Sequence, residues 1–353
     1  MARRRITTLA IVLLLIAPAA LVRASPWPLG QGKLVLSAGF DHQIANREFL
    51  DDGPARAFPL QGRFNASTFS VGIRAGFTDR IDFEAQLPFR VVNYDSDPVV
   101  LLEQPAGSPE LPLDYYQRNV IDLTRSVTGA GDFRIAGRYA FMRRPFALAA
   151  ELRVKAPTGY DPPAGTFGEQ PTSSEEFVTR IREFVAPGNV QDDVTLGDGQ
   201  MDLTASLLLG RVFRTGTFLR LGAGYNLRLG DAGDQVVGDL RIGQALGRRV
   251  LAYVGARGAY TLDRGRRIGV SVAAIDPELP AEAYGGTTNL LLREVTLDRD
   301  AVDVGGGLIV RMSERLELNA RYDHTVIGRN TAAIHGFGVS LAFRTDYGPP
   351  PPR

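Results

Sequence analysis

Hydrophobic and polar residues alternate along most of this chain. Ile81, Phe83 and Ala85 take every second position, and the charged residues Asp82 and Glu84 stand between them. Successive side chains of a β-strand point to opposite faces, so this period of two predicts a strand with one apolar and one polar face. The pattern covers residues 81–91 and recurs at 34–41, 69–77, 132–141, 146–155, 200–213, 217–228, 235–246, 249–261, 301–312, 315–326 and 333–343.

The lengths of these segments suit a membrane crossing made by strands. We predict about twelve of them, each near the 9–11 residues that a tilted transmembrane strand needs. After residue 24, no run approaches the roughly 18 apolar residues of a spanning helix. Two further segments, 267–275 and 289–297, are also β-like, so fourteen strands is the alternative count.

The connections between the predicted strands alternate in length. Tight turns are expected at 78–80, 143–145, 214–216, 246–248 and 313–315. The connections between them are mostly longer, at 45–65, 95–130, 158–198 and 262–300, with 229–234 and 327–332 as short exceptions. Short turns on one side and long loops on the other are typical of bacterial outer-membrane barrels.

Aromatic residues gather at both ends of the apolar faces, as in the two girdles of a lipid-facing surface. Those near the tight turns are Phe77, Phe141, Phe146, Phe213, Phe218 and Phe343. Those near the long connections are Phe40, Phe89, Phe133, Tyr225, Tyr260, Tyr322 and Phe337. The sequence therefore predicts an all-β protein: a transmembrane antiparallel up-and-down β-barrel, closed because an open sheet edge is unstable in lipid.

Residues 1–24 have the pattern of a secretory signal peptide, with a basic start, an apolar centre and small residues before Ser25. An uncleaved N-terminal helix is the alternative. We divide the chain into the signal peptide 1–24, an outer-membrane β-barrel 25–343 and a proline-rich periplasmic tail 344–353. The expected location is the bacterial cell outer membrane, reached by a Sec-type signal.

Four stretches resemble a known group: GFTDRIDFEAQLPF, GDFRIAGRYAF, LRVKAPTG and LGDGQMDLTASLLLGRVF. They are similar to the outer-membrane barrels of the MetA-pathway of phenol degradation group, often labelled transporters. The resemblance implies passage of small compounds, with aromatic or hydrophobic ones as candidates, and it assigns no substrate-contacting residue. The stretch 338–343 resembles a barrel-assembly signal, which implies the barrel-assembly machinery as a partner, although a tail follows it here.

The polar faces give the candidate pore lining. By alternation, the inward side chains are Arg74, Asp82, Glu84, Arg90, Arg134, Arg138, Glu151, Arg153, Lys155, Asp202, Arg220, Arg228, Asp239, Arg241, Arg257, Asp303, Arg311, Glu317 and Arg321. Basic groups modestly outnumber acidic ones, which predicts a polar pore with weak anion preference. The alternative is a mutually neutralised lattice of ion pairs filling a narrow barrel.

Composition narrows the chemistry further. A net charge of +1 does not suggest nucleic acid as a partner, and the absence of cysteine excludes disulfides and thiolate sites. His42, His324 and His335 fall at the outer strand ends and are a candidate metal site, with interfacial polar residues as the alternative. Only Ser37 has a spacing that suits these histidines, and it faces inward and lies deeper, so we predict no catalytic residues. We also predict no bound metal and no cofactor.

The connection 158–198 contains a candidate constriction. Ser173 and Glu176 have capping-box spacing, and Phe177, Ile181 and Phe184 follow at helical spacing. This predicts a short amphipathic helix that either narrows the pore or caps the outer surface.

The predicted function is passive diffusion of small solutes across the outer membrane. The expected partners are the lipids of that membrane and the small-molecule solute, and the sequence does not predict the oligomeric state. A non-conducting structural or adhesive barrel and a barrel-embedded lipid hydrolase are the alternatives.

Overall fold

The computed structural model describes residues 25–50, 53–100, 106–107, 120–121, 123–159, 196–263, 265, 267–276, 278–279, 290–296 and 298–347. The segment 1–24 predicted as a signal peptide, the helix expected at 173–185 and the last residues of the predicted tail lie outside these ranges. Within them, no helix has the length and apolar character that crossing a membrane requires.

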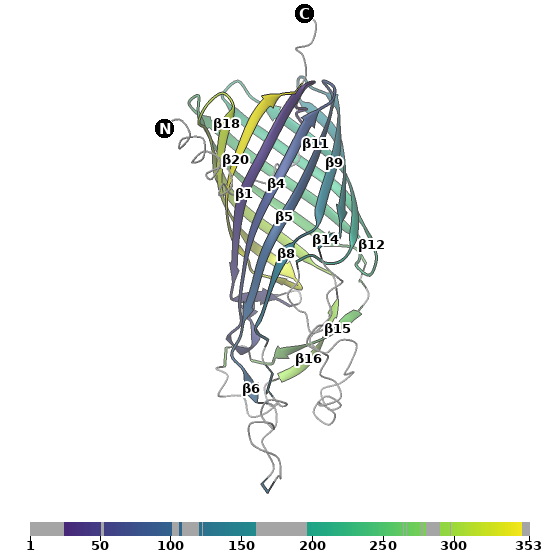
Figure 1. Ribbon diagram of the computed structural model, residues 1–353, viewed down its shortest axis with the longest axis vertical. Helices are drawn as coiled ribbons and strands as arrows, with labels where there is room; N and C mark the ends of the chain where they lie inside the picture. The colour runs from purple at the N-terminus through teal and green to yellow at the C-terminus, as the bar shows by residue number, and fades with distance from the viewer. Residues whose placement is uncertain are drawn as a thin grey trace, which may run out of the picture.

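The main sheet closes into a twelve-stranded antiparallel barrel, which confirms the predicted fold class (Figure 1). Each strand pairs with its neighbours around the barrel, and closure runs through the pairing of β1 with both β4 and β20. The twelve strands are β1 (Lys33–Ala45), β4 (Arg63–Gly76), β5 (Ile81–Asp95), β9 (Phe133–Met142), β10 (Ala147–Ala156), β11 (Met201–Val212), β12 (Thr217–Leu229), β13 (Gln235–Leu246), β14 (Val250–Thr261), β17 (Asp300–Arg311), β18 (Leu316–Arg329) and β20 (His335–Asp346). A further segment, β8 (Arg125–Ala130), continues the position of β9, because both pair with β5.

The two faces of the barrel wall differ as the alternation predicts. Val71, Leu207 and Val254 are 60%, 60% and 65% exposed on the outside of the wall. Charged Asp82 and Glu151 are 0% and 5% exposed on the inside. An apolar surface left open to the surroundings and a polar surface turned inward are the reverse of a water-soluble protein and suit a barrel in lipid.

The remaining elements lie at the end of the long connections. They are β2 (Arg47–Phe49), β3 (Arg56–Ala57) and β19 (Thr331–Ala332), which form a small sheet, the 3-10 helix η1 (Pro59–Gln61), the pair β6 (Val99–Val100) and β7 (Val120–Ile121), and the hairpin β15 (Arg267–Ala274) and β16 (Leu290–Thr296).

The hairpin decides the strand count. β15 and β16 pair only with each other and lie beyond the end of the barrel, while β14 pairs directly with β17 (Figure 1). The alternative count of fourteen strands is therefore wrong, because these two β-like segments complete their hydrogen bonds outside the barrel wall.

The tight turns join the strands at the opposite end. Gly216 and Gly247 take left-handed backbone angles there, with φ of +81° and +77°, which glycine adopts without strain. β20 continues to Asp346, whose carboxylate lies 2.6 Å from Lys33 Nζ across the closing strand pair. The barrel wall thus runs three residues past the expected end at 343.

Candidate functional site: the charged barrel lumen

A buried ion cluster occupies the wall formed by β4, β5, β9 and β10. Arg138 donates hydrogen bonds to Asp82 at 3.0 Å and also to Glu84 and Glu151. Arg74 donates two hydrogen bonds to Asp82, at 2.9 and 2.7 Å. The strand register produces this cluster, since Arg138 lies directly opposite Asp82 on β5 and opposite Glu151 on β10. With Arg153, which also pairs with Glu151, three guanidinium groups balance the three carboxylates.

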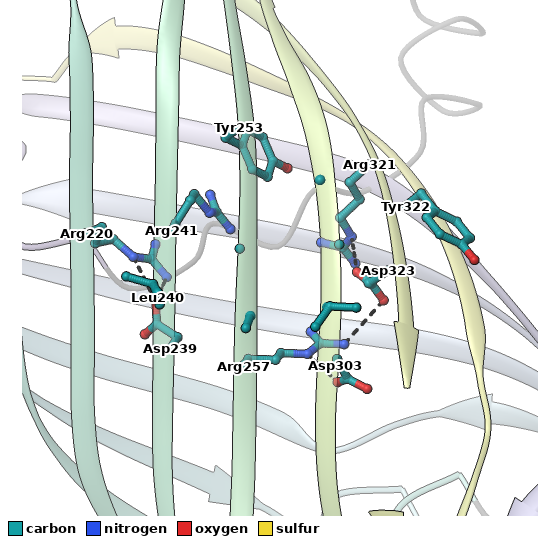
Figure 2. A pocket seen from close by; sticks show the side chains of 15 residues that line it. Arg220, Asp239, Leu240, Arg241, Tyr253, Arg257, Asp303, Arg321, Tyr322 and Asp323 are labelled. Atoms are coloured by element: carbon teal, nitrogen blue, oxygen red, sulfur yellow. Dashed lines mark hydrogen bonds and ion pairs between the residues drawn. The ribbon is translucent and has the colours of Figure 1, made fainter. Parts of the chain in front are cut away.

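A second set of ion pairs lines the wall opposite, on β12 to β18, and extends to Asp41 on β1. Figure 2 shows the charged side chains of these strands pointing toward one another. The space that they help to line has a volume of about 30 Å³. A space of that volume holds about one or two water molecules. The pairs are Arg220 with Asp239, Arg257 with Asp303 and Asp323, and Arg321 with Asp41 and Asp323.

One guanidinium in this wall has an aromatic partner. Arg241 lies over the ring of Tyr253, 4.4 Å from its centroid, and the Tyr253 hydroxyl donates to Asn319 Oδ1 at 3.1 Å. Within the described residues, Arg241 forms no ion pair with a carboxylate. Its positive charge therefore remains available to an anion in the lumen.

The segment preceding β1 crosses the lumen near the tight turns. Pro26 is fully buried, and Trp27 and Leu29 bind the ion cluster through the backbone. The Trp27 carbonyl accepts a hydrogen bond from Arg74 at 2.9 Å, and the Leu29 amide donates to Asp82 at 3.2 Å. A Cβ atom at Gly210, on β11, the strand next to β10, would lie 2.5 Å from Pro26 and 2.7 Å from the Trp27 ring. The segment thus lies in the lumen and narrows it.

At the other end, two cations share two carboxylates. Lys155 Nζ lies 2.5 Å from Asp198 and 2.8 Å from Asp202, and Arg228 pairs with the same two groups. Burial raises the pKa of the Asp198 carboxyl, but Lys155 and Arg228 outweigh burial and hold that pKa below its ordinary value. This network ties the connection before β11 to the barrel wall.

The predicted pore residues differ in what surrounds them. Most are joined in ion pairs, including Arg153, which lies 2.7 Å from Glu151. Arg311 and Glu317 lie at the tight-turn rim, 3.7 Å apart, with the Arg311 side chain 57% exposed. Three of them form no ion pair with the described residues: Arg90, Arg134 and Arg241.

Several lumen residues are absent from the sequence-based set. Asp41 and Tyr253 share the inward parity of their strands, so alternation alone could have found them. Asp198, Arg299 and Trp27 lie outside the regular strands, where alternation gives no direction. They enter the lumen because the connections fold back over the barrel mouths.

The histidines fall into two groups on the outer ends of the strands. The rings of His324 and His335 stack with centroids 4.1 Å apart, and His42 is separate from them, stacked on Phe40. Among the described residues, no group of three or more potential ligands could hold a metal. The structure therefore does not unite the three histidines in one site.

One serine does lie beside a histidine, which corrects the sequence-based prediction. Ser67 Oγ is 3.0 Å from His42 Nδ1, because the two residues are direct partners across β1 and β4. Residue spacing missed this contact, since the pair is 25 positions apart in the chain. In the described part of the chain, no carboxylate or amide orients the other ring nitrogen, so the pair lacks the third member of a hydrolytic triad.

Comparison with solved structures finds channel and porin structures that resemble this chain to different degrees. An outer-membrane channel from Pseudomonas putida F1 is 9% identical and covers 92% of this chain and 100% of its own, with a TM-score of 0.58. The TodX monoaromatic hydrocarbon channel (a deltaS2 mutant) is 12% identical over 95% of this chain and 94% of its own, with a TM-score of 0.43. The KdgM porin is 5% identical over 87% of this chain and 98% of its own, with a TM-score of 0.38. At 9% identity, the likeness to the Pseudomonas putida channel shows the fold alone. No family model matches the sequence, and no curated protein matches it.

Proposed function

We propose that this chain is an outer-membrane channel for passive diffusion of small solutes. The observation that carries the proposal is the closed wall itself, apolar outside and charged inside. A lumen lined by fixed charges offers a polar path through lipid, and selectivity follows from bore and lining charge without a cofactor or covalent step. Purified protein in planar bilayers should give discrete steps of conductance.

The lumen charges favour anions over cations. Arg134 and Arg241 carry charges that no described carboxylate neutralises, whereas the carboxylates of the central ion clusters are paired with cations. The reversal potential in a potassium chloride gradient should therefore show mild anion preference. A clear cation preference would contradict the proposed lining.

The solute class is the finer part of the proposal. The motif resemblance to the phenol-degradation group favours aromatic or hydrophobic compounds. Liposome swelling with phenolics against sugars of similar size tests it, with faster entry of phenolics expected. Equal entry of both classes would leave a general channel for small solutes.

A non-conducting barrel is the second candidate, and one observation favours it. The segment holding Pro26 and Trp27 reaches Gly210 on β11, and Arg74 holds its backbone inside the barrel through a hydrogen bond. A plugged barrel would serve a structural or adhesive role through its outer connections. Silence in planar bilayers, together with correct insertion, would support this alternative over the channel.

A further inference from the structure

A cavity of about 490 Å³ lies in the barrel mouth at the end of the long connections. Residues of β4, β5, β9 and β10 line it together with residues of η1, β2 and β19, which cross the mouth. Cavities of this size bind small molecules in other proteins. We call this space the vestibule.

One side of the vestibule carries guanidinium groups that form no ion pair with a carboxylate of the described residues. Arg90 donates to the Leu196 carbonyl at 2.8 Å, and Arg299 donates to Thr331 Oγ1 at 2.9 Å. Arg134 donates no hydrogen bond to the described part of the chain, and its side chain is exposed to the lumen. Arg134 thus presents a planar set of donors suited to a carboxylate, with two further positive charges beside it.

The other side of the vestibule is apolar. Phe58 and Tyr94 pack edge to face with centroids 5.4 Å apart, and Phe64 lies opposite Tyr94 in the strand register. Behind them, Val92 is 2% exposed and belongs to a small buried cluster with Leu196. Rigid aromatic rings over a packed apolar base favour a flat or compact apolar ligand.

Two of the three acidic side chains that line the vestibule lie beside Lys155. Four basic and three acidic side chains line it, which leaves one positive charge in excess. Asp198 is paired with Lys155 at 2.5 Å, and Asp132 lies 3.8 Å from the same ammonium. The excess matches a ligand that carries a single negative charge.

We infer that the vestibule binds a small amphipathic monoanion, an aromatic or alicyclic carboxylate, before it enters the pore. The carboxylate contacts Arg134 between Arg90 and Arg299, and the ring lies against Phe64 and Tyr94. The inference deepens the proposed channel function, on which its role as an entry site rests, by naming the ligand class and the residues that select it.

Blocking of single-channel current at pH 7 tests the site with three probes. Benzoate has both the charge and the ring, acetate has the charge alone, and benzyl alcohol has the ring alone. Benzoate should reach half-block at a concentration about tenfold lower than either of the other two, since it uses both sides of the vestibule. Equal potency of acetate or benzyl alcohol would overturn the inference.

Two arginine variants locate the effect. Arg134→Gln should raise the benzoate half-block concentration about tenfold, because it removes the charged donors. Arg241→Gln removes the same charge from the lumen outside the vestibule, and it should change that concentration by less than about twofold. Equal effects of the two variants would mean that benzoate responds only to total lumen charge, which would overturn the site.

Calorimetric titration of detergent-solubilised protein with benzoate separates this inference from the proposed function. If the barrel conducts but benzoate binding is absent or is unchanged by Arg134→Gln, the vestibule site is wrong and the channel proposal stands. If the barrel does not conduct, the channel proposal is wrong. A heat of benzoate binding that Arg134→Gln reduces would still support the vestibule site. Phe64→Ala should weaken binding of benzoate but leave the weak binding of acetate unchanged.

Discussion

At the scale of single residues, Arg138 organises the barrel wall. It is 3% exposed and contacts three carboxylates that come from two different strands. Its ion pairs offset the free-energy cost of removing the guanidinium from water only while all of these partners remain in place. The cluster therefore makes the register of β5, β9 and β10 mutually dependent.

Replacing Arg138 by methionine should destabilise the barrel strongly. Arg138→Met keeps the bulk of the side chain but leaves Asp82, Glu84 and Glu151 with too few cations, at a cost of about 3–5 kcal/mol in the free energy of unfolding. Urea unfolding in detergent or lipid vesicles measures the change. Arg143→Met is the control, because that side chain is 45% exposed and lies 3.9 Å from Asp79, so its loss should cost less than about 0.5 kcal/mol. Equal stability of the two variants would contradict the account of the cluster.

At the scale of elements, the strands and the connections were predictable to different degrees. Alternation gives the strands nearly residue by residue, and the segment 235–246 coincides with β13, because each face meets one uniform environment. The β15–β16 hairpin shows the limit, since its alternation resembles that of a wall strand. Only its partner strand decides its place, and strand pairing is a tertiary choice that local sequence does not encode.

The same limit applies to the lumen. Parity places Arg134 and Arg241 inward, but it cannot show that they lack carboxylate partners, because partner choice depends on side chains across several strands. The segment before β1 has no alternation at all. Its place in the lumen follows from Arg74 and Asp82, whose remaining hydrogen-bonding groups bind its backbone.

Removing that segment should widen the lumen. Deletion of residues 25–30 takes away Pro26 and Trp27 from the space in front of Gly210, while Arg74 and Asp82 keep each other as partners. Single-channel conductance should rise because the narrow part of the lumen widens. Deletion of residues 348–353 removes a piece of equal length at the other end of the chain and should leave conductance unchanged. Equal conductance of the first variant and the parent would show that the segment does not limit the pore.

At the scale of the whole molecule, the fold depends on two environments that the wall keeps apart. Leu207 and Thr204 lie three positions apart on β11 and face opposite sides, with Leu207 60% exposed outward and Thr204 bonded to Asn226 inside. A lysine at the first position meets hydrocarbon, and a lysine at the second meets a polar lumen. The wall should tolerate these two changes very differently.

Leu207→Lys should lower the free energy of unfolding by about 2–4 kcal/mol, the cost of a lysine on the lipid face near the bilayer centre. Thr204→Lys should cost only about 1 kcal/mol, from the lost hydrogen bond to Asn226 at 2.7 Å. Urea unfolding of both variants in lipid vesicles gives the comparison, and detergent of varied chain length shows whether the Leu207 effect follows the surrounding apolar phase. Similar losses of unfolding free energy for both lysines would mean that the outer wall does not face lipid. The barrel would then not span a membrane, and the channel proposal would be wrong.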